Sequence, residues 1–201
     1  MELTPLVKGD AIPVEVGEEP ISGLGEYAGI SIAFEVSRVL DVSADPRGGF
    51  ILSERVLEVP YIKDYDGHPD DAPAQWARRF DLTNWALLVA RVDGRRVGGA
   101  AVVFDPAGVT MLEGRPDVTL LQDIRVSAEV RGFGVGSALF QAAEAWARAR
   151  GCRRLEIETQ NVNVAACRFY ARQGCRLESI DRFAYPDLPN EVQLIWIKEL
   201  V

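Results

Sequence analysis

The stretch IRVSAEVRGFGVGSALF, residues 124–140, places three glycines between an extended run and a helical run. Glycine weakens both kinds of element, so this accumulation indicates a loop whose backbone must stay bare. A loop that leads from a strand into a helix points unpaired amides, and the positive end of the helix dipole, at one small volume. Gly132, Gly134 and Gly136 leave room for an anion there, while Ser137 adds a hydroxyl and Arg131 a positive charge. The stretch therefore predicts a phosphate-binding turn, with a tight turn that binds nothing as the alternative.

The hydrophobic pattern on either side of this loop predicts strands and helices in alternation. Residues 30–38 and 50–59 flank a turn-rich segment and predict a β-hairpin; a second hairpin is expected over 84–104, with Asp93-Gly94 as its turn. The other predicted elements are a short helix at 72–80 opened by Asp71, strands at 117–126 and 153–160, helices that end at Gly151 and run from Asn163 to Gly174, and two final strands near 175–185 and 192–199. Residues 1–26 are interpreted as an extension or an edge element.

This order of elements predicts an α/β (α+β) fold with a mixed sheet. The strands at 117–126 and 153–160 flank one helix, so we expect them to be parallel, with a right-handed crossover. The antiparallel hairpins add the rest of the sheet. A length of 201 residues fits a single domain over 1–201.

Composition narrows the classes of function. A formal charge of -8 argues against nucleic acid and anionic membranes as partners and fits a cationic small molecule. The three cysteines lack metal or redox spacing, which indicates a reducing, cytoplasmic setting, and Cys167 and Cys175 are expected to be buried. The apolar run at 85–90 is too short to span a bilayer, and the N-terminus lacks a signal-peptide pattern. His68 is the sole histidine, so no metal site is expected.

Two common phosphate loops fit the glycine cluster poorly. The P-loop of nucleotide triphosphatases needs a lysine after its last glycine, whereas Ser137 follows Gly136. The dinucleotide fingerprint needs a third glycine where Ser137 stands and an acid at the end of the next strand, whereas Glu156 lies in the middle of its strand. The preceding hairpins also disagree with a doubly wound parallel sheet.

The motif RGFGVG, residues 131–136, resembles the Q/R-x-x-G-x-G/A pyrophosphate loop of the GNAT superfamily of N-acetyltransferases. NVAACRFYARQGC, residues 163–175, resembles the second helix of that family, except that Cys175 stands where phenylalanine is usual. The resemblance covers residues 84–199 and, more weakly, the hairpin from about residue 30. LQDIRV, LEIETQNVN and the late DRFAYP are most similar to the streptothricin acetyltransferases. The resemblance to the GNAT superfamily implies a mixed, mostly antiparallel sheet with a central parallel β-α-β unit and helices on both faces.

The resemblance also implies acetyl-CoA as cofactor and assigns residues to it. The diphosphate is expected on the amides of residues 132–137 and the pantetheine arm along strand 120–126, with a backbone amide near Val126 polarising the thioester. The expected cofactor-binding residues are Ile124, Val126, Arg131, Gly132, Gly134, Val135, Gly136, Ser137, Asn163, Ala166 and Tyr170. Tyr170 is expected to act as general acid. Glu158 and Asp123 are both candidates for the base; alternatively they pair with Arg154 and Arg125.

The resemblance implies an amine as the acceptor, and an acidic chain with many carboxylates suits a cation. Candidate acceptor-binding residues are Asp64, Asp66, Asp70, Asp71, Asp181, Tyr185 and Glu191, with Tyr61 and Tyr65 as aromatic walls. A solvated acidic loop is the alternative interpretation of the first four. The predicted function is acetyl transfer to a small cationic amine such as a streptothricin-type antibiotic, by a monomer or homodimer. Transfer to a protein N-terminus, a lysine or a small metabolic amine, and acyl-CoA binding without turnover, remain alternatives.

Overall fold

The structure is a computed structural model that describes residues 12–67, 71–104 and 114–200. The elements follow the chain in this order: β1 (Glu15–Glu19), η1 (Ile21–Gly23), α1 (Leu24–Tyr27), β2 (Phe34–Ala44), β3 (Phe50–Lys63), η2 (Pro73–Arg78), β4 (Trp85–Val92), β5 (Arg95–Phe104), β6 (Val118–Val126), η3 (Ala128–Val130), α2 (Val135–Ala149), β7 (Arg154–Gln160), α3 (Val164–Arg172), β8 (Arg176–Asp181) and β9 (Gln193–Glu199). The labels η mark short 3₁₀ helices.

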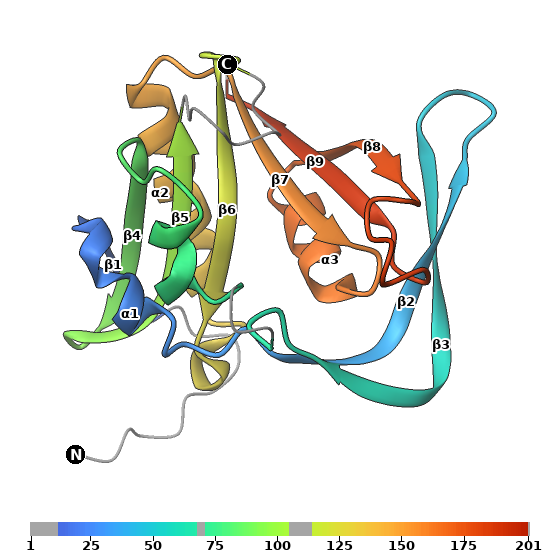
Figure 1. The fold of residues 1–201 in the computed structure, drawn as a ribbon, viewed down its shortest axis with the longest axis horizontal. Coiled ribbons are helices and arrows are strands. Elements are labelled where there is room, and N and C mark those ends of the chain that lie inside the picture. The colour runs from blue at the N-terminus through green and yellow to red at the C-terminus, as the bar shows by residue number, and fades with distance from the viewer. Residues whose placement is uncertain (1–11, 68–70, 105–113, 201) are drawn as a thin grey trace.

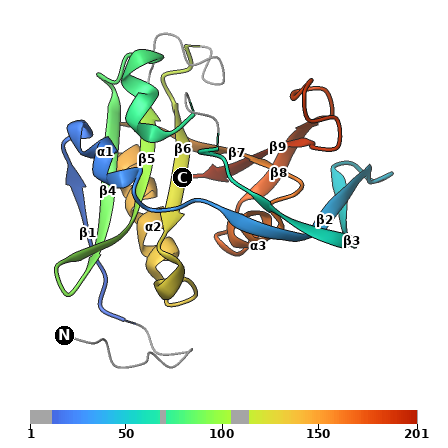
Figure 2. The ribbon, with the colours of Figure 1, turned by 60° about the horizontal axis from the view of Figure 1, so that its bottom comes forward.

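Seven of these strands form one sheet in the order β1-β4-β5-β6-β7-β9-β8, while β2 and β3 form a separate hairpin. The pair β6–β7 is parallel, and the other pairs of the described sheet are antiparallel. This confirms the predicted mixed sheet and its central β-α-β unit. β1 at the sheet edge confirms that residues 1–26 contain an edge element. Figure 2 shows the hairpin reaching away from the large sheet beside α3.

Helices cover both faces of the sheet, and β4 shows why its sequence is continuously apolar. Ala86 and Leu88 point into a core shared with α2 and α3, whereas Leu87 and Val89 point into a second core with α1 and η2. In Figure 1, α1 lies in front of these strands and α2 behind them. A strand buried on both faces is expected to lack the usual polar alternation.

Two adjacent glycines in β5 let both layers approach the sheet closely. A Cβ on Gly99 would lie 2.8 Å from the ring of Tyr27, and a Cβ on Gly98 would lie 2.9 Å from the carbonyl oxygen of Arg125. Tyr27 is completely buried there. Because the ring occupies the space of the missing side chain, α1 packs directly on the strand that borders the site.

Some local predictions are wrong. The segment predicted as a helix opened by Asp71 is the 3₁₀ helix η2, which follows Ala72 without a side-chain cap. Asp71 instead accepts a hydrogen bond from Arg79 at 2.9 Å. The first hairpin begins only at Phe34 and extends to Lys63. The turn at Asp93-Gly94 is confirmed, because both residues have the positive φ that a two-residue hairpin turn requires.

Cys167 and Cys175 are free and buried, as predicted, and Cys152 is free and buried as well. None of the described helices is long and apolar enough to cross a membrane.

Candidate active site

A cleft of about 860 Å³ opens where the two parallel strands separate. β6 and β7 are paired only from Val118 to Leu121 on the β6 side, and β7 then continues in register with β9. The register between β5 and β6 shifts at the same place, so that Gln122 is an extra residue in its strand. A bulge bends a strand and interrupts its ladder. Figure 1 shows β6 and β7 diverging below this point, which leaves the β7-facing edge of residues 122–126 without a strand partner.

The glycine loop lies at the end of this unpaired edge. Gly132 and Gly134 both have φ near +90°, and α2 starts directly after Gly134. The amides of Arg131 and Phe133 bond to carbonyls within the loop, whereas those of Gly132, Gly134, Gly136 and Ser137 bond to no backbone acceptor among the described residues. A Cβ on Gly134 would meet nothing within 4 Å. These amides are therefore free and reachable for an anion.

Neighbouring side chains hold the loop in place. Arg131 donates from Nε to the Val126 carbonyl at 2.9 Å and from Nη2 to the Ser31 carbonyl at 3.3 Å. The Ser137 hydroxyl accepts a hydrogen bond from Gln173 at 3.0 Å, which leaves its own proton for a ligand. Val135 is buried in the core and does not line the cleft, so among the expected cofactor residues it offers only its backbone.

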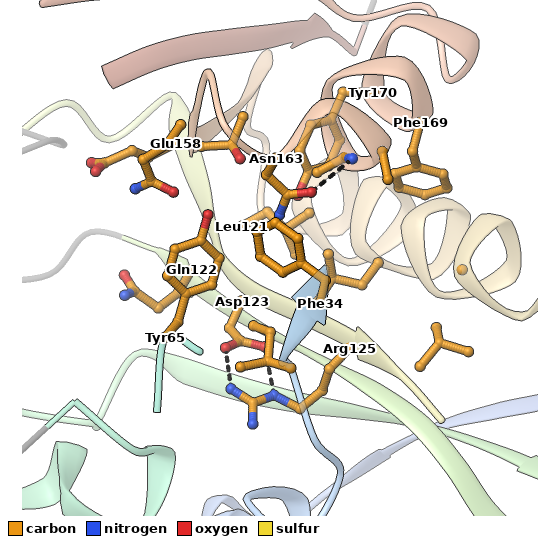
Figure 3. A pocket seen from close by; sticks show the side chains of 18 of the residues that line it. Phe34, Tyr65, Leu121, Gln122, Asp123, Arg125, Glu158, Asn163, Phe169 and Tyr170 are labelled. Atoms are coloured by element: carbon orange, nitrogen blue, oxygen red, sulfur yellow. Dashed lines mark hydrogen bonds and ion pairs between the residues drawn. The ribbon is translucent and has the colours of Figure 1, made fainter. Parts of the chain in front are cut away.

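Helix α3 forms the opposite wall of the cleft. Asn163 caps it by accepting a hydrogen bond from the Ala166 amide at 3.1 Å, as predicted. Ala166, Phe169 and Tyr170 then line the cleft together with Ile124 and Val126 from β6. Figure 3 shows Asn163 and Tyr170 side by side above the labelled side chains of β6.

Tyr170 combines burial with a free hydroxyl. Its side chain is 5% exposed, and no described residue hydrogen-bonds to its hydroxyl. Burial raises the pKa of Tyr170, and the charge of Asp123 raises it further. The hydroxyl therefore keeps its proton at neutral pH, which is the state that a general acid requires and which excludes Tyr170 as a base.

Four described carboxylates line the cleft, and only one of them lacks a basic partner. Asp66 and Asp123 both bind Arg125, at 2.7 Å and 2.5 Å, and Asp71 binds Arg79 at 2.9 Å. Glu158 is different, because it accepts a hydrogen bond from the neutral hydroxyl of Tyr185 at 2.6 Å. Its negative charge is therefore left to attract a cation in the cleft.

The two candidates for the base thus have different surroundings. The sequence predicts Asp123 to be either the base or an ion-pair partner of an arginine. In the structure it forms an ion pair with Arg125, and the Tyr27 hydroxyl also donates a hydrogen bond to it. The Arg125 side chain is 1% exposed and binds the Ile30 carbonyl as well. Asp66, Asp123 and Arg125 therefore form one ion-paired network on the cleft wall, of which Figure 3 shows Asp123 and Arg125.

The alternative pairing of Glu158 with Arg154 is not observed. Arg154 binds Glu156 and Glu199, whereas Glu158 lies one pleat further along β7, where the strand has left β6. Glu156 is an ion-pair partner of Arg115 at 2.7 Å, in line with a structural role.

The cleft brings together only some of the predicted acceptor residues. Asp66, Asp71, Tyr65 and Tyr185 line it, whereas Asp64, Asp181, Glu191 and Tyr61 do not. Asp64 and Asp181 each accept a hydrogen bond from a nearby backbone amide, and Glu191 binds Lys63 at 2.6 Å. His68 and Asp70 lie outside the described residues.

Several cleft residues could not have been found from a motif. Phe34 and Trp76 come from the hairpin and from η2, whose position over the site depends on the tertiary fold. Phe169 lies within the predicted second helix, and its place on the same helix face as Ala166 is the signal that could have indicated it. Taken together, the free loop amides, the unpaired strand edge and the buried acid define a cleft for an acyl donor with a phosphate-bearing handle.

Comparisons with known proteins agree with this class. The sequence model of the acetyltransferase (GNAT) family matches residues 54–175. Streptothricin acetyltransferase A of Bacillus subtilis (strain 168) is 37% identical over 157 residues, which are 77% of this chain and 83% of that protein. Streptothricin acetyltransferase of Escherichia coli is 32% identical over 168 residues, 81% of this chain and 83% of that protein.

Solved structures share the fold. The crystal structure of a nourseothricin acetyltransferase superposes with a TM-score of 0.71 at 25% identity and covers 94% of this chain and 99% of that one. A Bacillus anthracis str. Ames protein, solved in complex with acetyl coenzyme A, has a TM-score of 0.72 at 22% identity over the same shares. The chain belongs to the acetyltransferase (GNAT) family. It is an N-acetyltransferase that takes its acetyl group from acetyl coenzyme A.

Proposed function

We propose that this enzyme acetylates a primary amine of a small cationic molecule of the streptothricin type. The observation that carries the proposal is Glu158, the described cleft carboxylate without a basic partner. An unpaired negative charge beside a buried tyrosine attracts an ammonium group and then removes its proton. The relatives named as streptothricin acetyltransferases support the same class of acceptor.

The residues present fit acetyl-CoA. The free amides of Gly132, Gly134, Gly136 and Ser137 would hold its diphosphate, and the open space at Gly134 admits it. The unpaired edge of residues 122–126 would hydrogen-bond the pantetheine arm as an added strand, next to Asn163 and Ala166. When bound, acetyl-CoA supplies an activated acetyl carbonyl and a thiolate leaving group. A backbone amide near Val126 would polarise that carbonyl.

The protein side of the chemistry divides between two residues. Glu158 takes a proton from the acceptor's ammonium group, either directly or through one water, and leaves a nucleophilic amine. Tyr170 gives its proton to the departing sulfur. We assign Asp123 a structural part, because its charge is already neutralised by Arg125. Asp66, Asp71 and Tyr185 form the acceptor side of the cleft. Asp64, Asp181 and Glu191 do not line the cleft and would attract a cation only through the long-range effect of their negative charge.

Thiol release tests this proposal directly. The pure protein is mixed with acetyl-CoA and, in separate reactions, streptothricin, 1,4-diaminobutane, lysine and a peptide with a free N-terminus. We expect release with streptothricin that Glu158→Gln reduces strongly and the control Glu129→Gln, an exposed residue of η3, leaves unchanged. Release with the peptide alone would contradict the small-molecule acceptor. No release with any amine would contradict turnover and favour a protein that only binds acyl-CoA.

A further inference from the structure

One tyrosine on the acceptor side has a hydroxyl with no assigned role. Tyr65 follows β3 and lines the cleft, with its ring centroid 5.6 Å from that of Phe34 and 5.6 Å from the Lys63 ammonium. Its hydroxyl oxygen is buried and forms no hydrogen bond of good geometry with a described residue; its polar neighbours are the side chains of Asn163 and Thr159. In Figure 3 the Tyr65 side chain rises into the space between Glu158 and Asn163.

A buried hydroxyl without a partner costs free energy, so the fold keeps it only at the expense of stability or for a ligand. Burial also raises the pKa of Tyr65, which keeps the group neutral. A neutral hydroxyl offers one donor and two acceptor lone pairs. The ring packs at a tilt against Phe34, which restricts its movement on the cleft wall.

The position of Tyr65 assigns this hydroxyl to the acceptor rather than to the acetyl donor. The donor side of the cleft is built from β6, the glycine loop and α3, whereas Tyr65 arrives from the hairpin on the opposite side, next to Asp66. Its hydroxyl lies within electrostatic reach of Tyr170 and of Tyr185, the hydrogen-bond donor to Glu158. Tyr65 therefore faces the region between the proposed acid and the proposed base.

We propose that the Tyr65 hydroxyl accepts a hydrogen bond from the reacting nitrogen and, together with Glu158, selects primary amines over N-alkylated amines; this rests on the proposed function. Tyr65 positions the nitrogen and gives up no proton. The acceptor class is thus a primary amine on an arm narrow enough to pass between aromatic rings.

The protons of the reaction explain the selectivity. An acceptor R-NH₃⁺ loses one proton to Glu158 and becomes R-NH₂, which keeps two N–H groups, one for Tyr65 and one for Glu158. The nitrogen then forms the C–N bond as the C–S bond breaks. Tyr170 protonates the sulfur, the second proton that leaves the nitrogen restores the Tyr170 hydroxyl through water, and Glu158 passes its proton to solvent, so the products are the amide, CoA-SH and one H⁺. An N-methyl amine has only one N–H at the attacking stage, so it satisfies one of the two acceptors.

The test compares a primary amine with its N-methyl derivative on wild-type protein and on Tyr65→Phe. The primary amine is the fastest acceptor in the thiol-release panel, and 1,4-diaminobutane with N-methyl-1,4-diaminobutane is the simple pair. We expect Tyr65→Phe to lower the preference in kcat/KM for the primary amine about tenfold. The Kd for acetyl-CoA, measured by calorimetry, should not change. Tyr61→Phe is the matched control, because Tyr61 lies on the same hairpin outside the cleft.

Thermal unfolding separates this role from a structural one. Tyr65→Phe removes a group without a partner, so its Tm should equal or exceed that of the wild type. An unchanged preference for the primary amine would overturn the inference, whether the Tm falls or stays the same. If the wild-type protein itself acetylates no amine in the panel, the proposed function fails and this inference fails with it. An active enzyme whose preference for the primary amine is the same with and without the Tyr65 hydroxyl would instead overturn this inference alone.

Discussion

The hydroxyl of Tyr185 donates a hydrogen bond of 2.6 Å to Oε1 of Glu158 and accepts one of 2.8 Å from Gln160. Tyr185 belongs to the connection between β8 and β9, far from β7 in the sequence. The bond therefore ties this connection to the cleft and fixes the direction of the Glu158 carboxylate. Burial raises the pKa of Tyr185, with the charge of Glu158 as a further cause, so the hydroxyl stays protonated and remains the donor.

Removing the charge of Glu158 should disable the base. Glu158→Gln keeps the size of the side chain, and we expect kcat/KM to fall about 100-fold or more, the usual contribution of a general base. Acetyl-CoA binding should stay unchanged in calorimetry, because the cofactor side of the cleft is built from other elements. A variant with wild-type turnover would assign proton removal to water or to another group.

Removing the hydroxyl of Tyr170 should lower kcat without unfolding the protein. No described residue bonds to that hydroxyl, so Tyr170→Phe should keep the wild-type Tm to within about 2 °C while kcat falls about 100-fold. Since the pKa of Tyr170 is raised above its ordinary value near 10, kcat should not decline between about pH 7 and pH 9. A decline in that range that Tyr170→Phe abolishes would show that the hydroxyl titrates too early for this assignment.

The glycine loop can be tested with two alanine variants two residues apart, at Gly134 and Gly136. Gly134 has φ +90°, so Gly134→Ala should cost about 1–2 kcal/mol of the free energy of unfolding and place a methyl group in the anion space. Gly136 has ordinary helical geometry, and its added Cβ would make normal contact with Phe169 at 3.5 Å. We expect calorimetry to show weakened acetyl-CoA binding for Gly134→Ala only. Equal affinities of both variants would remove the loop as the diphosphate site.

Asn161 is a stability residue rather than a simple turn former. Its Nδ2 donates to the Leu40 carbonyl at 3.1 Å, and its Oδ1 accepts from the Val192 amide at 2.8 Å. The Leu40 amide in turn bonds to the Asn161 carbonyl at 2.9 Å, so the hairpin is attached to the sheet through this residue. Asn161→Ala would leave two buried groups without partners, and we expect chemical denaturation to show a loss of about 2–4 kcal/mol. A loss below about 0.5 kcal/mol would mean that the hairpin is held elsewhere.

The cysteines should be silent in any thiol assay of the folded enzyme. Burial raises the pKa of Cys167 and of Cys175 to about 12 and also raises that of Cys152. The thiolate is the reactive form, so at about pH 8 almost no reactive sulfur is present. We expect a disulfide reagent to detect no thiol until denaturant is added, and then three. Fast labelling of the native protein would contradict the burial of these side chains.

Local sequence determined the parts of this protein that depend on neighbouring residues. The Asp93-Gly94 turn, the Asn163 cap and the left-handed glycines at 132 and 134 each follow from the φ values or hydrogen bonds that only those residue types provide cheaply. The parallel pairing of β6 with β7 followed from one helix between two strands. The glycine loop and Tyr170 on α3, the proposed acid, were likewise indicated by motifs of neighbouring residues.

Tertiary structure alone decided which charges are free in the cleft. Asp123 and Glu158 look alike in the sequence, each alternating with apolar residues on a strand. Asp123 is ion-paired because Arg125 lies two residues along the same strand face, and Tyr27 donates to it from another segment; Asp66 binds the same guanidinium. Glu158 forms no ion pair with a described residue, because β7 separates from β6 after Leu121 and Glu158 lies beyond that point. Which of these side chains come close to an arginine depends on the register of β6 with β5 and β7 and on the bulge at Gln122, and no local sequence pattern encodes either.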